Sequence, residues 1–220
     1  MRSRRGDIMD YYLLAGDAIL VEEFAYGEDH VTVGLAGAMW SAGDTGWRGT
    51  GAFGQFLRTD DDLLSVLTPI RRDRAARVLR DLDGGVLPSE LELRARFGDW
   101  VRFSNAAPLR LGSGETPQGY AEKRVYRVLF AKEPRAAQLA ELSAAWRGST
   151  PGGLPSGKGR AGNHLFTWNL RRVGRGIAWG LDVTMLLGLE SPDLAGAVLR
   201  KLTADVRERG LVPVTTERFA

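Results

Sequence analysis

The sequence predicts an α+β fold, with a mainly antiparallel sheet built from three strand pairs plus a terminal strand, and with helices packed on one face. Three observations predict it: strand-like apolar runs come in pairs, a capped helix-like segment follows each pair, and one more apolar run follows the last helix. Strand pairs that helices connect favour antiparallel pairing. We expect the 220 residues to form a single domain over 1–220, with a flexible N-terminal segment over 1–10.

The first strand pair is a hairpin over residues 17–40. Its apolar runs flank a Gly-Glu-Asp turn at 27–29. A glycine-rich stretch over 41–58 follows, after which Thr59 and Asp60 offer helix caps. Thr68-Pro69 is a second start signal, and that helix is expected to reach about residue 83, where two glycines stop it.

The second pair is expected over 94–103 and 123–131. A helix then opens at Pro134 and ends near Gly148. Glycine and proline dominate residues 148–162, which we interpret as a flexible surface loop or lid.

The third pair comprises 164–172 and 177–187. The residues 191–193 then cap a last helix that runs to Arg209, and 211–219 form the final strand.

Composition excludes several kinds of site. The chain has no cysteine and only His30 and His164, so thiolate catalysis, disulfides and an all-histidine metal site within one chain are excluded. We expect no metal and no cofactor, although a carboxylate-bound magnesium stays open. No apolar run is long enough to span a bilayer and no signal peptide is recognised, so we expect a cytoplasmic protein without a membrane partner.

Arginines cluster over 71–80, but the cluster favours a solvated helix face over a nucleic-acid site. Ala75 and Leu79 belong to the apolar stripe, whereas Arg74 and Arg77 share the outer side with Asp73. Because Asp73 and Arg77 are four residues apart on a helix, much of this charge is neutralised locally.

Glu22 and Glu23 interrupt the most apolar run of the chain. Side chains alternate along a strand, so whichever face is inside carries a carboxylate among apolar neighbours. Desolvation would raise the pKa of such a carboxylate and suit it to general acid or base catalysis. The alternative is a structural salt bridge with an arginine, or a position near a strand end.

The third hairpin gathers polar residues on one side. A two-residue turn at Gly174-Arg175 would place Thr167 opposite Asp182 and Asn169 opposite Gly180. This side is then either an ordinary wet face or, if the loops at 41–54 and 148–162 fold over it, a pocket for an anionic small molecule. In the pocket hypothesis Asp182 is the base and Arg171 the anion anchor. The polar side carries Thr167, Asn169, Arg171, Asp182 and Thr184.

Three further residues are candidates. His164 follows the predicted loop and would titrate near neutral pH, unless it is simply packed or exposed. Trp47 and Arg48 would close on a ligand by stacking and charge, or Trp47 would anchor its loop to the body. The candidate catalytic residues are thus Glu22, Glu23, Asp182 and His164, and the candidate substrate-binding residues are Trp47, Arg48, Thr167, Asn169, Arg171 and Thr184.

Three functional hypotheses follow. The leading one is a small, cofactor-independent bacterial enzyme that performs proton-transfer chemistry, such as elimination, cyclisation or isomerisation, on an anionic substrate. A net charge of +3 also suits a substrate tethered to an acidic carrier protein in specialised metabolism. The alternative is a non-catalytic binding subunit of a heteromeric complex, or a homodimer, with exposed aromatics at its interface. Nucleic-acid binding is the weakest of the three.

Overall fold

The computed structural model describes residues 4–5, 9–103, 115–174, 178–189 and 194–219. Within these residues the chain forms two antiparallel sheets and six helices, which confirms the α+β class. It divides into two compact units. Unit 1 comprises Met1–Glu28 and Thr32–Asn105, and unit 2 comprises Asp29–Val31 and Ala106–Ala220. The strands that were predicted in one sheet therefore lie in two sheets, and the single domain over 1–220 stays a prediction.

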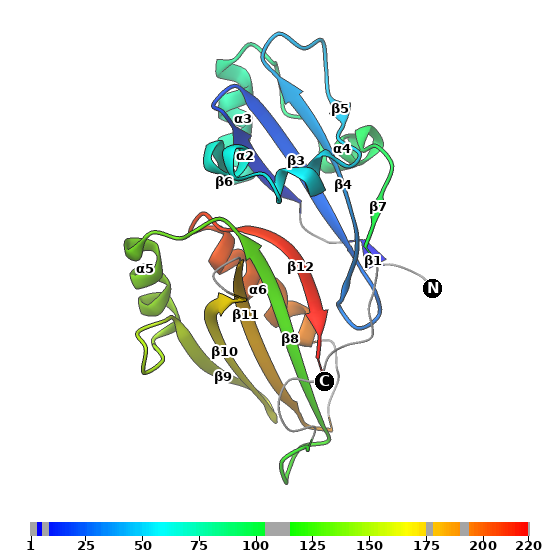
Figure 1. The fold of residues 1–220 in the computed structure, drawn as a ribbon. Coiled ribbons are helices and arrows are strands. Elements are labelled where there is room, and N and C mark those ends of the chain that lie inside the picture. The colour runs from blue at the N-terminus through cyan, green and yellow to red at the C-terminus, as the bar shows by residue number, and fades with distance from the viewer. Residues whose placement is uncertain (1–3, 6–8, 104–114, 175–177, 190–193, 220) are drawn as a thin grey trace. The chain divides into compact units, whose positions relative to one another are not determined.

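Unit 1 is built on a sheet in which the strand order is β5-β4-β3-β2-β6, with β1 beside β3 and β7 beside β4 (Figure 1). The hairpin predicted over 17–40 is confirmed, since Val21 pairs with Ala38 and Phe24 with Leu35. The strands are β1 (Arg4–Arg5), β2 (Asp10–Leu14), β3 (Ala18–Tyr26), β4 (Thr32–Ser41), β5 (Arg48–Gly49), β6 (Leu67–Ile70) and β7 (Val101–Arg102).

The helices of unit 1 are α1 (Phe53–Leu57), α2 (Asp61–Val66), α3 (Arg72–Asp81) and α4 (Glu90–Arg96). Helix α2 begins as predicted, because the side chain of Asp60 accepts the backbone N–H of Leu63 at 2.9 Å. The helix start predicted at Thr68-Pro69 is wrong, since both residues lie in β6. Proline is tolerated there because β6 is an edge strand, where a missing N–H breaks no ladder.

The strand predicted over 94–103 is also wrong for most of its length. Ser89 and Glu92 form a capping box that starts α4, so Arg94 is helical and only β7 remains extended. Strand β7 pairs with β4, not with the strand over 123–131. The Ser-x-x-Glu spacing was the signal for a helix at this point.

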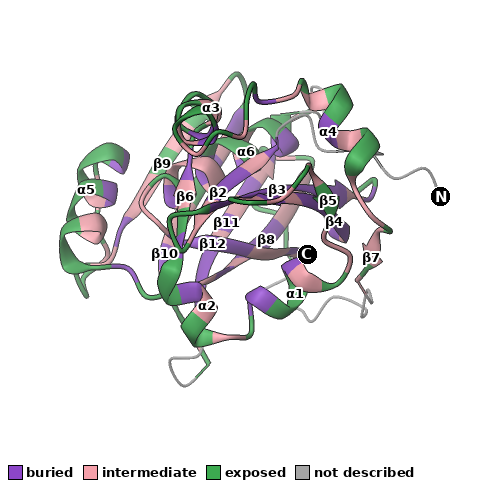
Figure 2. Cartoon of the chain, turned by 90° about the horizontal axis from the view of Figure 1, so that it is seen from above, coloured by how far each residue is buried: buried purple, intermediate pink, exposed green. Residues whose placement is uncertain are grey.

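Both faces of the unit 1 sheet are covered by helices. Leu79 of α3 and Leu93 of α4 join Val21 and Trp40 in one core cluster. On the other face, α1 approaches so closely that a Cβ on Gly54 would lie 3.2 Å from Cδ2 of Leu35. Strand β3 is accordingly buried along almost its whole length (Figure 2).

Unit 2 is built on a sheet with the strand order β12-β8-β11-β10-β9 (Figure 1). Its helices α5 (Ala136–Trp146) and α6 (Leu194–Arg207) contribute to one core cluster with the sheet and so lie on one face, as expected. The caps predicted at 191–193 lie outside the described residues. The strands are β8 (Glu122–Ala131), β9 (Ser156–Ala161), β10 (His164–Val173), β11 (Ala178–Leu187) and β12 (Val212–Arg218).

The third hairpin forms with the predicted faces but a different register. Val173 pairs with Ala178, so the connection spans four residues, 174–177, and Asn169, not Thr167, faces Asp182. A shift of two residues keeps the alternation of side chains, so each residue stays on its predicted face. Phe166, Leu170 and Leu181 are buried in the core cluster.

The loop predicted over 148–162 is largely ordered structure. Residues 149–155 form a turn closed by a bridge between Ser149 and Pro155, and β9 follows. The glycines of β9 allow this: a Cβ on Gly157 would lie 2.7 Å from ring atoms of Trp168. The indole therefore occupies the space where the strand's own side chains would stand, which explains why a glycine-rich segment is a strand.

Candidate functional site

Glu22 lies on the face of β3 that α1 covers. Its Oε2 accepts a hydrogen bond from Nη2 of Arg58 at 2.8 Å, and its Oε1 accepts one from Nη1 at 3.1 Å. Arg58 Nη1 also donates to the carbonyl of Gly54, and the guanidinium lies 5.3 Å from the ring centroid of Phe24. Burial opposes the charged form of Arg58, but the negative charge of Glu22 and its hydrogen bonds raise the pKa of Arg58 above its usual value. Arg58 therefore keeps its charge within this buried ion pair.

Glu23 lies on the opposite face of β3 and is paired in the same way. Arg94 of α4 donates through Nε to Oε2 at 3.0 Å and through Nη2 to Oε1 at 2.9 Å. Both glutamates are thus withdrawn from water, and each meets an arginine from the helical layer on its own face.

This pairing bears on catalysis. A general base needs an oxygen that is free to take the substrate's proton. In Glu22 and Glu23 the carboxylate oxygens already accept guanidinium N–H groups. The geometry supports the structural salt bridge, and a catalytic role for either residue stays a prediction.

Asp182 sits between two arginines on the face of the unit 2 sheet opposite α5 and α6. Its Oδ1 accepts from Nε of Arg127 at 2.6 Å, and its Oδ2 accepts from Nε of Arg171 at 2.7 Å. The Arg127 guanidinium also lies 5.1 Å from the ring centroid of Phe219. The cluster of two cations and one anion has a net charge of about +1. Arg171 was predicted as an anion anchor, whereas Arg127 was missed because β8 was not expected beside β11.

The other polar residues of the hairpin share this face. Thr167 pairs with Thr184, and Asn169 pairs with Asp182. Thr167 is exposed, and the side chain of Arg171 is 42% exposed. Within the described part of the chain, Arg171 uses only its Nε for hydrogen bonding. Its two terminal nitrogens can therefore donate to an external anion.

Strand β9 extends this face with two more cations. Lys158 pairs with Thr167 and Arg160 with Leu165, so both point to the same side as Arg171. Both side chains are exposed, and neither forms a salt bridge to any residue in the described ranges. Lys158 and Arg160 were not predicted as site residues, because the segment over 148–162 was interpreted as a loop.

His164 is packed inside unit 2. It is 2% exposed, and its Nδ1 accepts the backbone N–H of Gly188 at 3.0 Å. Its ring also lies 6.2 Å from that of Phe166. The packed alternative therefore describes His164, and a catalytic role for this residue stays a prediction.

Trp47 and Arg48 belong to unit 1. Trp47 packs against the core cluster beside α3 and α4, which supports its role as an anchor of the loop. Arg48 is exposed and forms an ion pair with Asp44 at 2.6 Å. The predicted site residues are accordingly divided: Glu22, Glu23, Trp47 and Arg48 lie in unit 1, and His164, Thr167, Asn169, Arg171, Asp182 and Thr184 lie in unit 2.

Comparisons with known proteins add no identity. No family model matches the chain, and neither a curated protein nor a solved structure is significantly similar to it. Among the described residues, no group of acidic or histidine side chains is arranged to hold a metal ion. No helix in the described ranges is long and apolar enough to cross a membrane.

Proposed function

We propose that this chain is a non-catalytic binding protein that recognises an acidic partner through the basic strip of unit 2. The basic strip is defined as Lys158 and Arg160 of β9 and Thr167 and Arg171 of β10. The observation that carries the proposal is that three cations on neighbouring strands point to one exposed side of the sheet. The proposal therefore develops the binding-subunit hypothesis, with an acidic protein as the partner.

Asp182 supports binding better than catalysis, because its oxygens already accept from Arg127 and Arg171 and so position these two cations. Glu22 and Glu23 are hydrogen-bonded to arginines of unit 1 that do not belong to the basic strip. In Asp182 this role is directly useful, because its contact with Arg171 Nε orients the rest of the guanidinium. A planar guanidinium held in this way recognises a carboxylate through two parallel hydrogen bonds.

Direct binding of a polyanion tests the proposal. Labelled poly-L-glutamate should bind, as followed by fluorescence anisotropy, and the affinity should fall as salt is raised. The Lys158→Glu/Arg160→Glu variant should bind about tenfold more weakly, since two attractive charges become repulsive.

The matched control is Arg74→Glu/Arg77→Glu, which changes the net charge equally on the exposed face of α3. It should bind poly-L-glutamate like the unmodified protein. Equal losses in both variants would mean that net charge alone attracts the polyanion, and the basic strip would then not be the site. Tighter binding of single-stranded DNA than of poly-L-glutamate would favour a nucleic-acid partner and overturn the proposal.

A further inference from the structure

Strand β9 stands at the edge of its sheet, with β10 on one side only. The backbone N–H of Leu170 donates to the carbonyl of Pro155 at 2.9 Å, which marks these two residues as a hydrogen-bonded pair. Such pairs recur at every second residue of an antiparallel ladder, so Gly157 and Gly159 also bond to β10. Lys158 and Arg160 fall between them, and their N–H and C=O groups point away from the sheet.

One hydrogen bond at the start of β9 supports this orientation. Ser156 has the same alternation as Lys158, and its N–H donates outwards to the carbonyl of Gly148 at 3.0 Å. The 148–155 segment therefore covers the edge at Ser156. Beyond Ser156, no strand of the described chain pairs with the outer side of β9.

We infer that β9 takes an extended acidic segment of the partner as an additional antiparallel strand. This inference rests on the proposed function and names the form in which the partner binds. Isolated surface ion pairs contribute little to affinity, so the basic strip alone gives weak binding. Main-chain hydrogen bonds to the outward groups of Lys158 and Arg160 supply the rest, as in other cases of strand addition.

The two faces of β9 define the partner segment. In an antiparallel pair, a residue directly opposite Lys158 has its side chain on the same face as the lysine and its own N–H and C=O directed at β9. An acidic residue fits that position. The next residue points to the other face, towards Gly157 and the partly buried ring of Trp168, and an apolar side chain suits that position. The segment is therefore one in which acidic and apolar residues alternate.

Charge argues against a second copy of this chain as the occupant, and backbone chemistry argues against a nucleic acid. A second copy of this chain would bring its own Lys158 and Arg160 against those of the first, and like charges directly opposite each other are destabilising. Basic residues on an edge strand discourage such self-pairing. A nucleic acid would meet the cations but has no amide backbone to pair with the edge.

Backbone methylation tests the inference. A labelled peptide of alternating glutamate and valine should bind to the full chain, and N-methylation of its glutamate amides should weaken binding by about tenfold or more, because these amides face β9. N-methylation of the valine amides should leave binding unchanged. Equal affinities for the two methylated peptides would overturn strand addition, and a reversed pattern would overturn the antiparallel arrangement.

A pair of variants at one residue provides the complementary test. Lys158→Gln removes the charge only, whereas Lys158→Pro also removes the outward N–H, which β10 does not use. The proline variant should bind the peptide more weakly than the glutamine variant while both unfold at a similar temperature. If the unmodified protein does not bind poly-L-glutamate, the proposed function itself is refuted. If it binds poly-L-glutamate but neither Lys158→Pro nor methylation of the glutamate amides weakens peptide binding beyond its control, strand addition alone is refuted.

Discussion

Nη2 of Arg58 and Oε2 of Glu22 lie 2.8 Å apart, with only 2% and 1% of the respective side chains exposed. Removing one partner leaves the other charge buried and uncompensated, which costs about 3–5 kcal/mol. Glu22→Gln should therefore lower the free energy of unfolding by about that amount, measured by urea denaturation.

The double variant Glu22→Leu/Arg58→Met separates charge from packing. Because it buries no unpaired ion, it should be more stable than Arg58→Met alone. If the losses of the single variants simply add in the double variant, the two residues do not act as a pair.

Glu122 predicts how stability changes with pH. The hydrogen bond from Arg124 lowers the pKa of Glu122, against the opposing effect of burial, and Arg218 lowers it further. A folded-state pKa below the unfolded value stabilises the protein above the unfolded value, and this contribution is lost as the pH falls through the folded value. Glu122→Gln should therefore be less stable than the unmodified protein near neutral pH. The difference should shrink once the pH falls below the unfolded value of about 4.3, and it should vanish only below the folded-state pKa.

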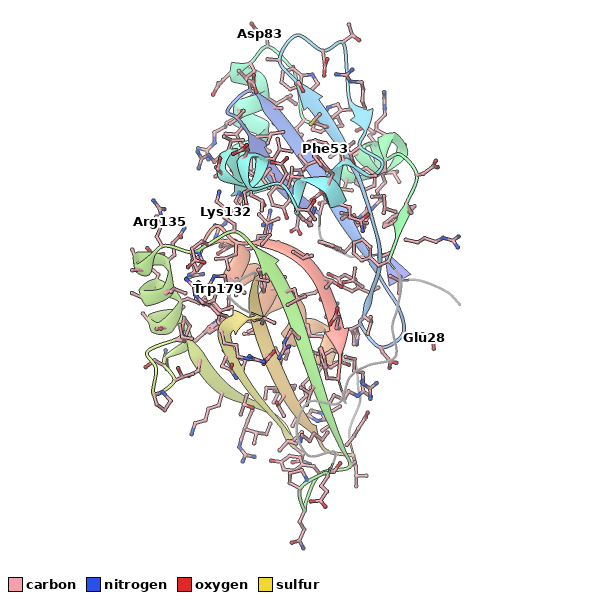
Figure 3. All side chains as sticks on the ribbon, in the orientation of Figure 1. Glu28, Phe53, Asp83, Lys132, Arg135 and Trp179 are labelled. Atoms are coloured by element: carbon pink, nitrogen blue, oxygen red, sulfur yellow. The ribbon has the colours of Figure 1, made fainter. Side chains whose placement is uncertain are left out.

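The expected difference at neutral pH is below about 1 kcal/mol, since the Glu122 side chain is partly exposed. Glu28 offers the control: it is exposed in the turn between β3 and β4 (Figure 3), and has no salt bridge within the described residues. Glu28→Gln should show no difference at either pH. A Glu122→Gln deficit that persists unchanged in acid would contradict the assignment.

Gly157 and Lys158 allow a comparison of the two faces of β9. A side chain on Gly157 would collide with Trp168, since the Cβ alone would lie 2.7 Å from the ring, and overpacking of this kind costs about 1–3 kcal/mol. Lys158→Val, on the exposed face, should change stability by less than about 0.5 kcal/mol. Thermal unfolding monitored by tryptophan fluorescence measures the stability of a variant with a side chain at position 157 and that of Lys158→Val. Equal stabilities of the two variants would show that Trp168 does not cover Gly157.

Asp182 accepts from Arg171 only at Nε and leaves the terminal nitrogens to an external anion, but its negative charge repels that anion. Asp182→Asn removes this internal carboxylate and raises the net charge of the cluster from about +1 to about +2. The affinity for poly-L-glutamate should therefore rise by about two- to fivefold in anisotropy titrations. Asp73→Asn makes the same change in net charge on α3, beside Arg77, and should have no effect. A loss of affinity in Asp182→Asn would mean that orientation of Arg171 matters more than its free charge.

Local patterns predicted much of the fold. The hairpin over 17–40 and the strands over 123–131, 164–172 and 177–187 follow from apolar runs, and the alternation in the third hairpin placed Asp182 and Arg171 on one face. Alternation has a period of two residues, so it could not detect that the hairpin connection is longer by two.

The remaining elements depend on contacts between distant residues. Strand β9 is stabilised by the ring of Trp168, which no local property of its glycines indicates. The arginine partners of Glu22 and Glu23 lie 36 and 71 residues further along the chain. A sequence does not show whether a carboxylate is paired with an arginine. The catalytic hypothesis and the salt-bridge alternative could therefore both be stated, but the partner arginines of Glu22 and Glu23 could not be named.

The two glutamates of β3 make the assembly of unit 1 interdependent. A sheet that formed before α1 and α4 docked would carry bare carboxylates on both surfaces, and docking of one layer would neutralise only one of them. Each helical layer thus completes a charge balance that the strand cannot satisfy by itself. The central strand becomes stable only when both layers are in place, so its amides should exchange with solvent in a single concerted opening rather than layer by layer.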